Sequence, residues 1–183
     1  MSEEKEKIVV FKFVLLGDPA VGKTSLVDIY IQHKFKESYK PTLGVNIVVK
    51  ELRIEEINAQ IRLVLWDIAG QEKYDVSRKM FFQGVLGALL VYDTTREDTF
   101  NNIESKWLKD LNKYSEGKLS CILIGNKTDL NDSRVVSTEK GRTLADKINA
   151  ADFIETSAKY GDNVEDAFKK LVYKVLKNLE ITS

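Results

Sequence analysis

Eight consecutive residues near the start of the chain, GDPAVGKT at positions 17–24, fit the pattern G-x-x-x-x-G-K-[ST] of a loop that binds phosphate groups. In such a loop, backbone N–H groups and the N-terminus of the following helix surround the phosphates. Lys23 would neutralise β- and γ-phosphate oxygens, and the hydroxyl of Thr24 would bind Mg²⁺. An apolar run precedes the pattern and a segment of helical character follows it, as this loop requires. These residues therefore predict binding of a nucleoside triphosphate with magnesium.

The phosphate loop alone does not choose the base or the reaction. ATPases, nucleotide kinases and GTPases all carry it. A chance match is rare, because a random chain of this length would contain the pattern in roughly one case in a hundred or fewer. Both properties therefore depend on residues elsewhere in the chain.

Four more polar patterns lie next to the ends of predicted strands. NKTD at residues 126–129, TSAK at 156–159 and WDIAGQE at 66–72 fall at or just after a strand, and PTLG at 41–44 falls just before one. Each one alone has a purely structural explanation, with Asn126 as a turn former, Asp67 as a strand-end carboxylate and Thr42 as a surface hydroxyl. Together with the phosphate loop they favour one ligand site, because ligands of α/β sheets bind at the carboxyl ends of the strands.

In this order the motifs resemble those of the Ras superfamily of small GTPases, most closely the Rab branch, over residues 11–179. The resemblance implies that Asp129 accepts hydrogen bonds from the ring N–H and the exocyclic amine of guanine. Adenine lacks this pair of donors, so the carboxylate would be left unpaired beside it. Lys127 would lie along the base, and Asn126 would tie this loop to the phosphate loop.

The resemblance implies further contacts around the nucleotide. The TSAK segment at residues 156–159, which includes Ser157 and Lys159, would form the family's third base-contacting loop. In it, the backbone N–H of Ala158 would donate to the guanine carbonyl. Phe35 matches the aromatic residue that packs against guanine, and Tyr39 matches the one that closes over the phosphates.

Two switch segments are also implied. Thr42, in the first, would be a second hydroxyl ligand of Mg²⁺ when GTP is bound, and Asp67 would hold the metal through a water. In the second, the Gly70 N–H would contact the γ-phosphate and Gln71 would orient the attacking water. GTP would hold Thr42 and Gly70 in place, and hydrolysis would release both segments.

The candidate site residues thus form three groups, with GTP or GDP and Mg²⁺ as the implied ligands. The catalytic group is Gln71, Lys23 and Thr42, and the metal ligands are Thr24, Thr42 and, through water, Asp67. The residues expected to contact the nucleotide are Asp18, Ala20, Val21, Gly22, Lys23, Thr24, Ser25, Phe35, Tyr39, Thr42, Gly70, Asn126, Lys127, Asp129, Ser157, Ala158 and Lys159.

The phosphate loop departs from many relatives at Pro19 and Ala20, where small residues, often glycine or serine, face the γ-phosphate. Pro19 has no N–H to offer a phosphate oxygen. The motifs also contain no arginine in cis at a recognisable place, so we expect slow hydrolysis, on the order of 10⁻⁴ s⁻¹. The alternative is a guanine-nucleotide-binding module with negligible hydrolysis. An ATP-using enzyme is a weaker alternative, which Asp129 opposes.

The elements that must position these residues follow from hydrophobic patterning. Short apolar runs predict strands at residues 8–16, 45–54, 61–66, 88–92, 121–124 and 153–154. Helical periodicity predicts helices at about 23–33, 99–113, 138–149 and 164–179. The alternation indicates one α/β domain over residues 1–183, after a charged extension at 1–7. We expect a phosphate-loop NTPase fold of the Ras-like type: a six-stranded, mostly parallel sheet with one antiparallel edge strand and five helices on both faces.

Composition limits the classes of partner. Lys plus Arg and Asp plus Glu both number 28, so net charge favours neither nucleic acid nor an anionic membrane. The single cysteine, Cys121, lies in an apolar run, where a buried, inert thiol is expected. No stretch approaches eighteen apolar residues, and the N-terminus lacks the apolar segment of a secretory signal. We expect a soluble, cytoplasmic monomer that meets effectors, exchange factors and activating proteins through its switch segments.

The end of the chain differs from that of Rab proteins, which carry prenylated cysteines. No cysteine follows Cys121, so we expect no lipid anchor on the chain as written. Either such a tail has been removed, or the chain is an unprenylated relative. Peripheral membrane association would then require the missing tail or a partner.

Overall fold

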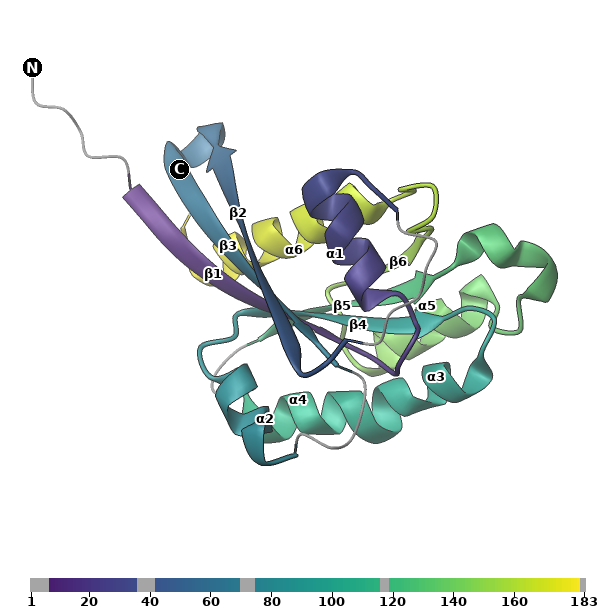
Figure 1. The fold of residues 1–183 in the computed structure, drawn as a ribbon. Coiled ribbons are helices and arrows are strands. Elements are labelled where there is room, and N and C mark those ends of the chain that lie inside the picture. Colours follow the sequence, from purple (N-terminus) through teal and green to yellow (C-terminus); the bar gives the residue numbers. More distant parts are fainter. Residues whose placement is uncertain (1–6, 36–41, 70–74, 116–118, 182–183) are drawn as a thin grey trace, which may run out of the picture.

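The computed structural model describes residues 7–35, 42–69, 75–115 and 119–181, arranged around a six-stranded sheet (Figure 1). The strand order is β2-β3-β1-β4-β5-β6. Strands β2 and β3 are antiparallel, and all other neighbours are parallel, which confirms the predicted sheet. The strands are β1 (Lys7–Leu16), β2 (Val45–Ile54), β3 (Ala59–Ile68), β4 (Gly87–Asp93), β5 (Ser120–Asn126) and β6 (Asp152–Thr156).

Helices cover both faces of the sheet. One apolar core contains side chains of α1 and α6, and a second core on the opposite face contains those of α2, α4 and α5 (Figure 1). The α-helices are α1 (Lys23–Gln32), α2 (Asp75–Phe82), α3 (Glu97–Asn102), α4 (Leu108–Tyr114), α5 (Thr138–Lys147) and α6 (Val164–Asn178). Short 3₁₀ turns lie at Glu55–Ile57 and Thr128–Ser133.

The predicted number of five helices is wrong, because the described residues form six α-helices. The segment predicted as one helix at 99–113 is helical throughout, but a π-helical turn, Ile103–Trp107, separates α3 from α4. The helix α2 had no predicted position. It has only eight residues, with Val76 in its first turn and its other apolar residues in its last, so it is too short to show the repeated spacing that identifies longer helices.

The two cores follow from the alternation of side chains along β1. Phe11, Phe13 and Leu15 point into the first core, whereas Val14 and Leu16 point into the second. The central strands β4 and β5 are buried along their whole lengths, which is why they appear in the sequence as unbroken apolar runs. A slip of one residue would exchange the side chains between the two cores, so close packing in each core fixes the register of the strands and the positions of the residues at their ends.

Tyr92, in β4, carries a buried hydroxyl that has no hydrogen-bond partner within the described ranges. Burial also raises the pKa of this phenol. Because an unpartnered buried hydroxyl is unfavourable, we expect Tyr92→Phe to raise the free energy of unfolding by about 1 kcal/mol. Urea unfolding of the two proteins measures the difference. Tyr173→Phe is the control, since it removes an exposed hydroxyl bonded to Glu56. A loss of stability in Tyr92→Phe would contradict the conclusion that the Tyr92 hydroxyl has no hydrogen-bond partner.

Cys121 is buried, as the sequence predicts, and burial raises the pKa of its thiol to about 11. The thiol is therefore protonated near neutral pH. Within the described ranges, no helix has the length and apolar character needed to cross a membrane.

Candidate nucleotide-binding site

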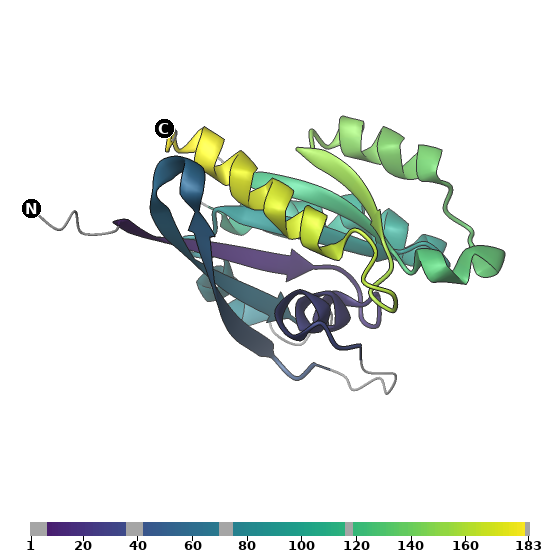
Figure 2. The same cartoon turned by 90° about the horizontal axis from the view of Figure 1, so that it is seen from above.

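The described residues of the polar motifs lie at the carboxyl ends of the parallel strands, which all point to the same end of the sheet (Figure 2). The phosphate loop, residues 17–22, joins β1 to α1. Asp67, Asp93 and Asn126 lie within the last two residues of β3, β4 and β5, and the segment 156–159 begins at the last residue of β6. Open α/β sheets bind ligands at this end.

Two glycines give the phosphate loop its shape. Gly17 has φ 152°, and a Cβ atom there would lie 2.2 Å from the carbonyl oxygen of Val91. Gly22 has φ 103°, and its Cβ atom would lie 2.2 Å from the Asn126 side chain. Only glycine fits these positions, so the backbone can pass close to β4 and β5 before α1 begins. The first turn of α1 contains no acidic residue, which leaves its N-terminus suited to an anion.

Lys23, the first residue of α1, is buried in the concave side of the phosphate loop. Its Nζ donates to the carbonyl oxygens of Gly17, at 2.8 Å, and Asp18, at 2.9 Å. Burial lowers the pKa of this amine to about 8, although the charges of Asp67 and Asp18 oppose the shift. The cation is thus held inside the loop by neutral acceptors, where an anionic ligand would stabilise its charge. Thr24 and Ser25 follow it in the same turn of α1 and are half-buried.

Thr24, Thr42 and Asp67 form one oxygen cluster beside Lys23. The Thr24 hydroxyl donates to Asp67 Oδ2, at 2.5 Å, and lies 2.8 Å from the Thr42 hydroxyl. Asp67 is fully buried, and its Oδ1 has no hydrogen-bond partner among the described atoms. Burial raises the pKa of Asp67, whereas the Thr24 bond and Lys23 oppose the shift.

This cluster fits a small divalent cation. Its donors are hydroxyl and carboxylate oxygens, which Mg²⁺ prefers, and the unpartnered Oδ1 of Asp67 is a buried acceptor that a metal-bound water would satisfy. Within the ranges that the structure describes, no group of three His, Cys, Asp or Glu residues could bind a metal alone. A cation here would therefore rely on ligand phosphates and water for the rest of its coordination, as Mg²⁺ sites commonly do.

The NKTD segment at residues 126–129 is called the base loop here. Its first residue, Asn126, connects it to the phosphate loop, as the resemblance implied. Its Nδ2 donates to the carbonyl oxygen of Val21, at 2.9 Å. Its Oδ1 accepts from the Thr156 hydroxyl, at 2.9 Å, and from the backbone N–H of Ala158, at 3.2 Å. Three loops are thus held together by one buried amide. The N–H of Ala158, expected to meet a guanine carbonyl, is bonded to Asn126 in this structure.

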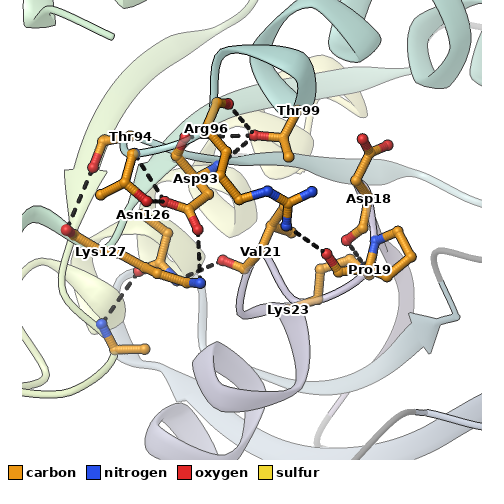
Figure 3. A network of polar contacts seen from close by, with 12 residues as sticks. Asp18, Pro19, Val21, Lys23, Asp93, Thr94, Arg96, Thr99, Asn126 and Lys127 are labelled. Carbon is orange, nitrogen blue, oxygen red and sulfur yellow. Dashed lines mark hydrogen bonds and ion pairs between the residues drawn. The ribbon is translucent and has the colours of Figure 1, made fainter. Parts of the chain in front are cut away.

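Asp129 and Lys127 each have a charged or polar partner that fixes their direction. The Ser157 hydroxyl donates to Asp129 Oδ1, at 2.7 Å, which leaves the second carboxylate oxygen available to a ligand. Lys127 has φ 70°, and its Nζ lies 2.7 Å from Asp93 Oδ2 (Figure 3). Asp93 is 1% exposed, and Thr95 donates to its other oxygen through both its N–H and its hydroxyl.

Phe35 and Lys159 come together although 124 residues separate them in the sequence (159 − 35). Both line a cavity of about 350 Å³ between the end of α1 and the loop that follows β6. The other lining residues are Ile29, Tyr30, His33, Tyr160, Gly161 and Glu165. The structure therefore brings the predicted aromatic residue of the base site to the third base-contacting loop.

Three of the predicted site residues lie outside the described residues, namely Tyr39, Gly70 and Gln71, as do Pro41 and Glu72 of the motifs around them. Their assigned roles therefore stay predictions.

Sequence reasoning missed several contacts of the site. Asp93 could have been identified as a site residue from its position at the carboxyl end of a buried strand, because ligands of α/β sheets bind there. Arg96 donates to the carbonyl oxygen of Pro19, and Asn102 and Trp107 both donate to the carboxylate of Asp18. The Asp18 side chain is thus directed at the α3 region, and only its backbone remains for a phosphate. No local pattern indicated these contacts.

Comparison with known proteins gives one consistent family. The model of the Ras family matches residues 12–177. Ras-related protein RABA6b of Arabidopsis thaliana is 41% identical over 174 residues, which cover 95% of this chain and 74% of that protein. Ras-related protein Rab-2B of Dictyostelium discoideum is 40% identical over 171 residues, covering 93% and 83%. GTP-binding protein ypt3 of Schizosaccharomyces pombe is 37% identical over 177 residues, covering 97% and 81%.

Proposed function

The chain belongs to the Ras family of small GTPases, and we propose that its residues at the strand ends form a magnesium-dependent GTP site that works as a Rab-like switch. Family membership makes it a GTP-binding protein and a GTP hydrolase.

The observation that carries the proposal is the oxygen cluster of Thr24, Thr42 and Asp67 next to the buried ammonium of Lys23. We assign both hydroxyls directly to Mg²⁺ and Asp67 to a water of its coordination shell. When bound, the metal neutralises charge on the β- and γ-phosphates. Lys23 would shift its hydrogen bonds from loop carbonyls to phosphate oxygens, which explains why it is held buried and cationic at the centre of the loop.

Hydrolysis is proposed as in-line attack of water on the γ-phosphorus. The bond from this phosphorus to the bridging oxygen breaks, and GDP and inorganic phosphate leave. Gln71 would orient the water, and the backbone N–H groups of the loop would stabilise the charge that develops on the phosphate oxygens. Asp129, directed by Ser157, would select guanine.

Switching follows from the contacts that only GTP can make. Thr42 and Gly70 would be held near the γ-phosphate and would be released when it leaves. Effectors, exchange factors and activating proteins would recognise the switch segments in one state or the other. We assign no nucleic-acid partner, because positive and negative side chains balance over the chain.

Thr24→Ala tests the metal assignment. In the unchanged chain, replacing EDTA with Mg²⁺ should slow the dissociation of a fluorescent GDP. In Thr24→Ala this slowing should fall by about tenfold or more, because one of the direct ligands is lost. Stopped-flow dissociation with and without Mg²⁺ measures both rates. Thr138→Ala is the matched control, since its hydroxyl is exposed and bonds to Glu155. A full magnesium effect in Thr24→Ala would refute the assignment.

A further inference from the structure

The phosphate loop contains a strained turn at Pro19 and Ala20. Ala20 has φ 63°, a left-handed conformation that is unfavourable for any residue with a Cβ atom. Pro19, just before it, has a fixed φ and no N–H. Strained backbone of this kind persists only where the surrounding structure holds it in place.

Three side chains from the α3 side hold this turn, and we call Arg96, Asn102 and Trp107 the α3 clamp. Asn102 Nδ2 donates to Asp18 Oδ2 at 2.7 Å, and Trp107 Nε1 donates to Asp18 Oδ1 at 2.7 Å. Arg96 Nη1 donates to the carbonyl oxygen of Pro19 at 3.1 Å, from the residue just before α3 (Figure 3). Both carboxylate oxygens of Asp18 and the next carbonyl are therefore fixed by one helical segment.

The π-helical turn makes this grip possible. Asn102 and Trp107 are five residues apart, and in a regular α-helix they would point about 140° away from each other. Here the Leu108 N–H bonds to the Ile103 carbonyl, five residues back, so residues with this spacing lie almost above one another. Wide turns of this kind are frequent at functional sites, and this one directs two donors at a single buried carboxylate.

The clamped arm of the phosphate loop, residues 18–20, is the one that we expect to face the terminal phosphate of a nucleotide. The other arm, Val21 and Gly22, lies against Asn126 of the base loop. A nucleotide that extends from the base loop along the phosphate loop therefore places its last phosphate toward Pro19 and Ala20. The clamp also turns the negative charge of Asp18 toward α3, away from where a triphosphate would lie.

We propose that the α3 clamp positions the turn at Pro19 and Ala20 against the γ-phosphate, and so sets the preference of the chain for GTP over GDP. Arg96, Asn102 and Trp107 are positioning residues, because they act through the loop. The inference rests on the proposed nucleotide site and adds the element that sets its relative affinity for GTP and GDP. GDP lacks the phosphate nearest this turn, so loss of the clamp affects GTP more.

The test compares two tryptophan substitutions. Trp107→Phe removes one clamp donor, whereas Trp66→Phe removes an indole N–H that is buried without a partner among the described atoms. Dissociation constants for GTP and GDP are measured with magnesium on each nucleotide-free protein. Trp107→Phe should lower the ratio of GTP to GDP affinity by roughly tenfold, the worth of one hydrogen bond to a charged group. Trp66→Phe should leave the ratio unchanged.

Ala20→Gly distinguishes the clamp from general packing. Glycine adopts the left-handed conformation without strain, so the turn needs less support. In the Ala20→Gly background, Trp107→Phe should change the affinity ratio by less than about threefold, which a double-mutant cycle reports as coupling. If the role of Trp107 were purely structural, Trp107→Phe would change the ratio of GTP to GDP affinity equally in the unchanged chain and in the Ala20→Gly background.

The outcomes separate the two proposals. If the unchanged chain binds neither GTP nor GDP, the proposed function fails. If it binds both, and Trp107→Phe keeps the same ratio or shows no coupling to Ala20→Gly, the clamp alone is overturned. Arg96→Ala gives a second test if Trp107→Phe does not fold, since the Arg96 side chain is 37% exposed. Its affinity ratio should fall in the same direction, and an unchanged ratio in this variant also overturns the clamp.

Discussion

Asp129→Asn is expected to exchange guanine for xanthine as the preferred base. The Asp129 carboxylate is oriented by the Ser157 hydroxyl, and its free oxygen and charge suit the two N–H donors of guanine. An amide in its place presents a donor, which matches the extra carbonyl of xanthine and opposes the amine of guanine. We expect GTP affinity to fall at least about 10²-fold, because a polar site rejects a ligand that leaves its groups unpaired. Affinity for xanthosine triphosphate should rise by a comparable factor.

Competition against a fluorescent GDP measures both affinities. Asp132→Asn is the matched control, because it makes the same change of charge at an exposed position in the same 3₁₀ turn. It should retain the preference for GTP. Unchanged affinities for GTP and xanthosine triphosphate in Asp129→Asn would show that this carboxylate does not read the base.

The strands and the motifs at their ends could be predicted from the sequence because both are local. The run at 45–54 matched β2 to the residue, and the other runs gave the centres of strands that extend one or two residues further at one or both ends. Strands end in polar residues where they approach the ligand site. A prediction from hydrophobicity alone therefore ends each of these strands too early. Asp93 and Asn126 are examples, because both belong to strands but are polar.

The contacts between distant segments could not be predicted, because no spacing encodes them. Asp18 meets Asn102 and Trp107 across 84 and 89 residues, and the π-helical turn that allows this depends on packing. At the N-terminus of α6 the residue type alone would also mislead, because asparagine commonly caps helices. Asn163 occupies the N-cap position, but its side chain donates to the Glu155 carbonyl and does not cap the helix.

Gln71→Leu is expected to remove most of the hydrolytic rate while nucleotide binding remains. Leucine cannot hydrogen-bond to water, so the attacking molecule would lose its orientation relative to the γ-phosphorus. Misplacement of a reacting group can cost about 10²-fold in rate. Lys23, Thr24 and Asp129 are unchanged in this variant, so GTP and GDP affinities should stay within about threefold of the original values.

The most direct test of the account is a single-turnover measurement of phosphate release from GTP bound to the chain with Mg²⁺. The unchanged chain should release phosphate on the order of 10⁻⁴ s⁻¹, as in related enzymes without an arginine in cis. Gln71→Leu should be about 10²-fold slower. Equal rates for the two proteins, both at the level of free GTP in the same buffer, would contradict the assignment of this site as the place of hydrolysis.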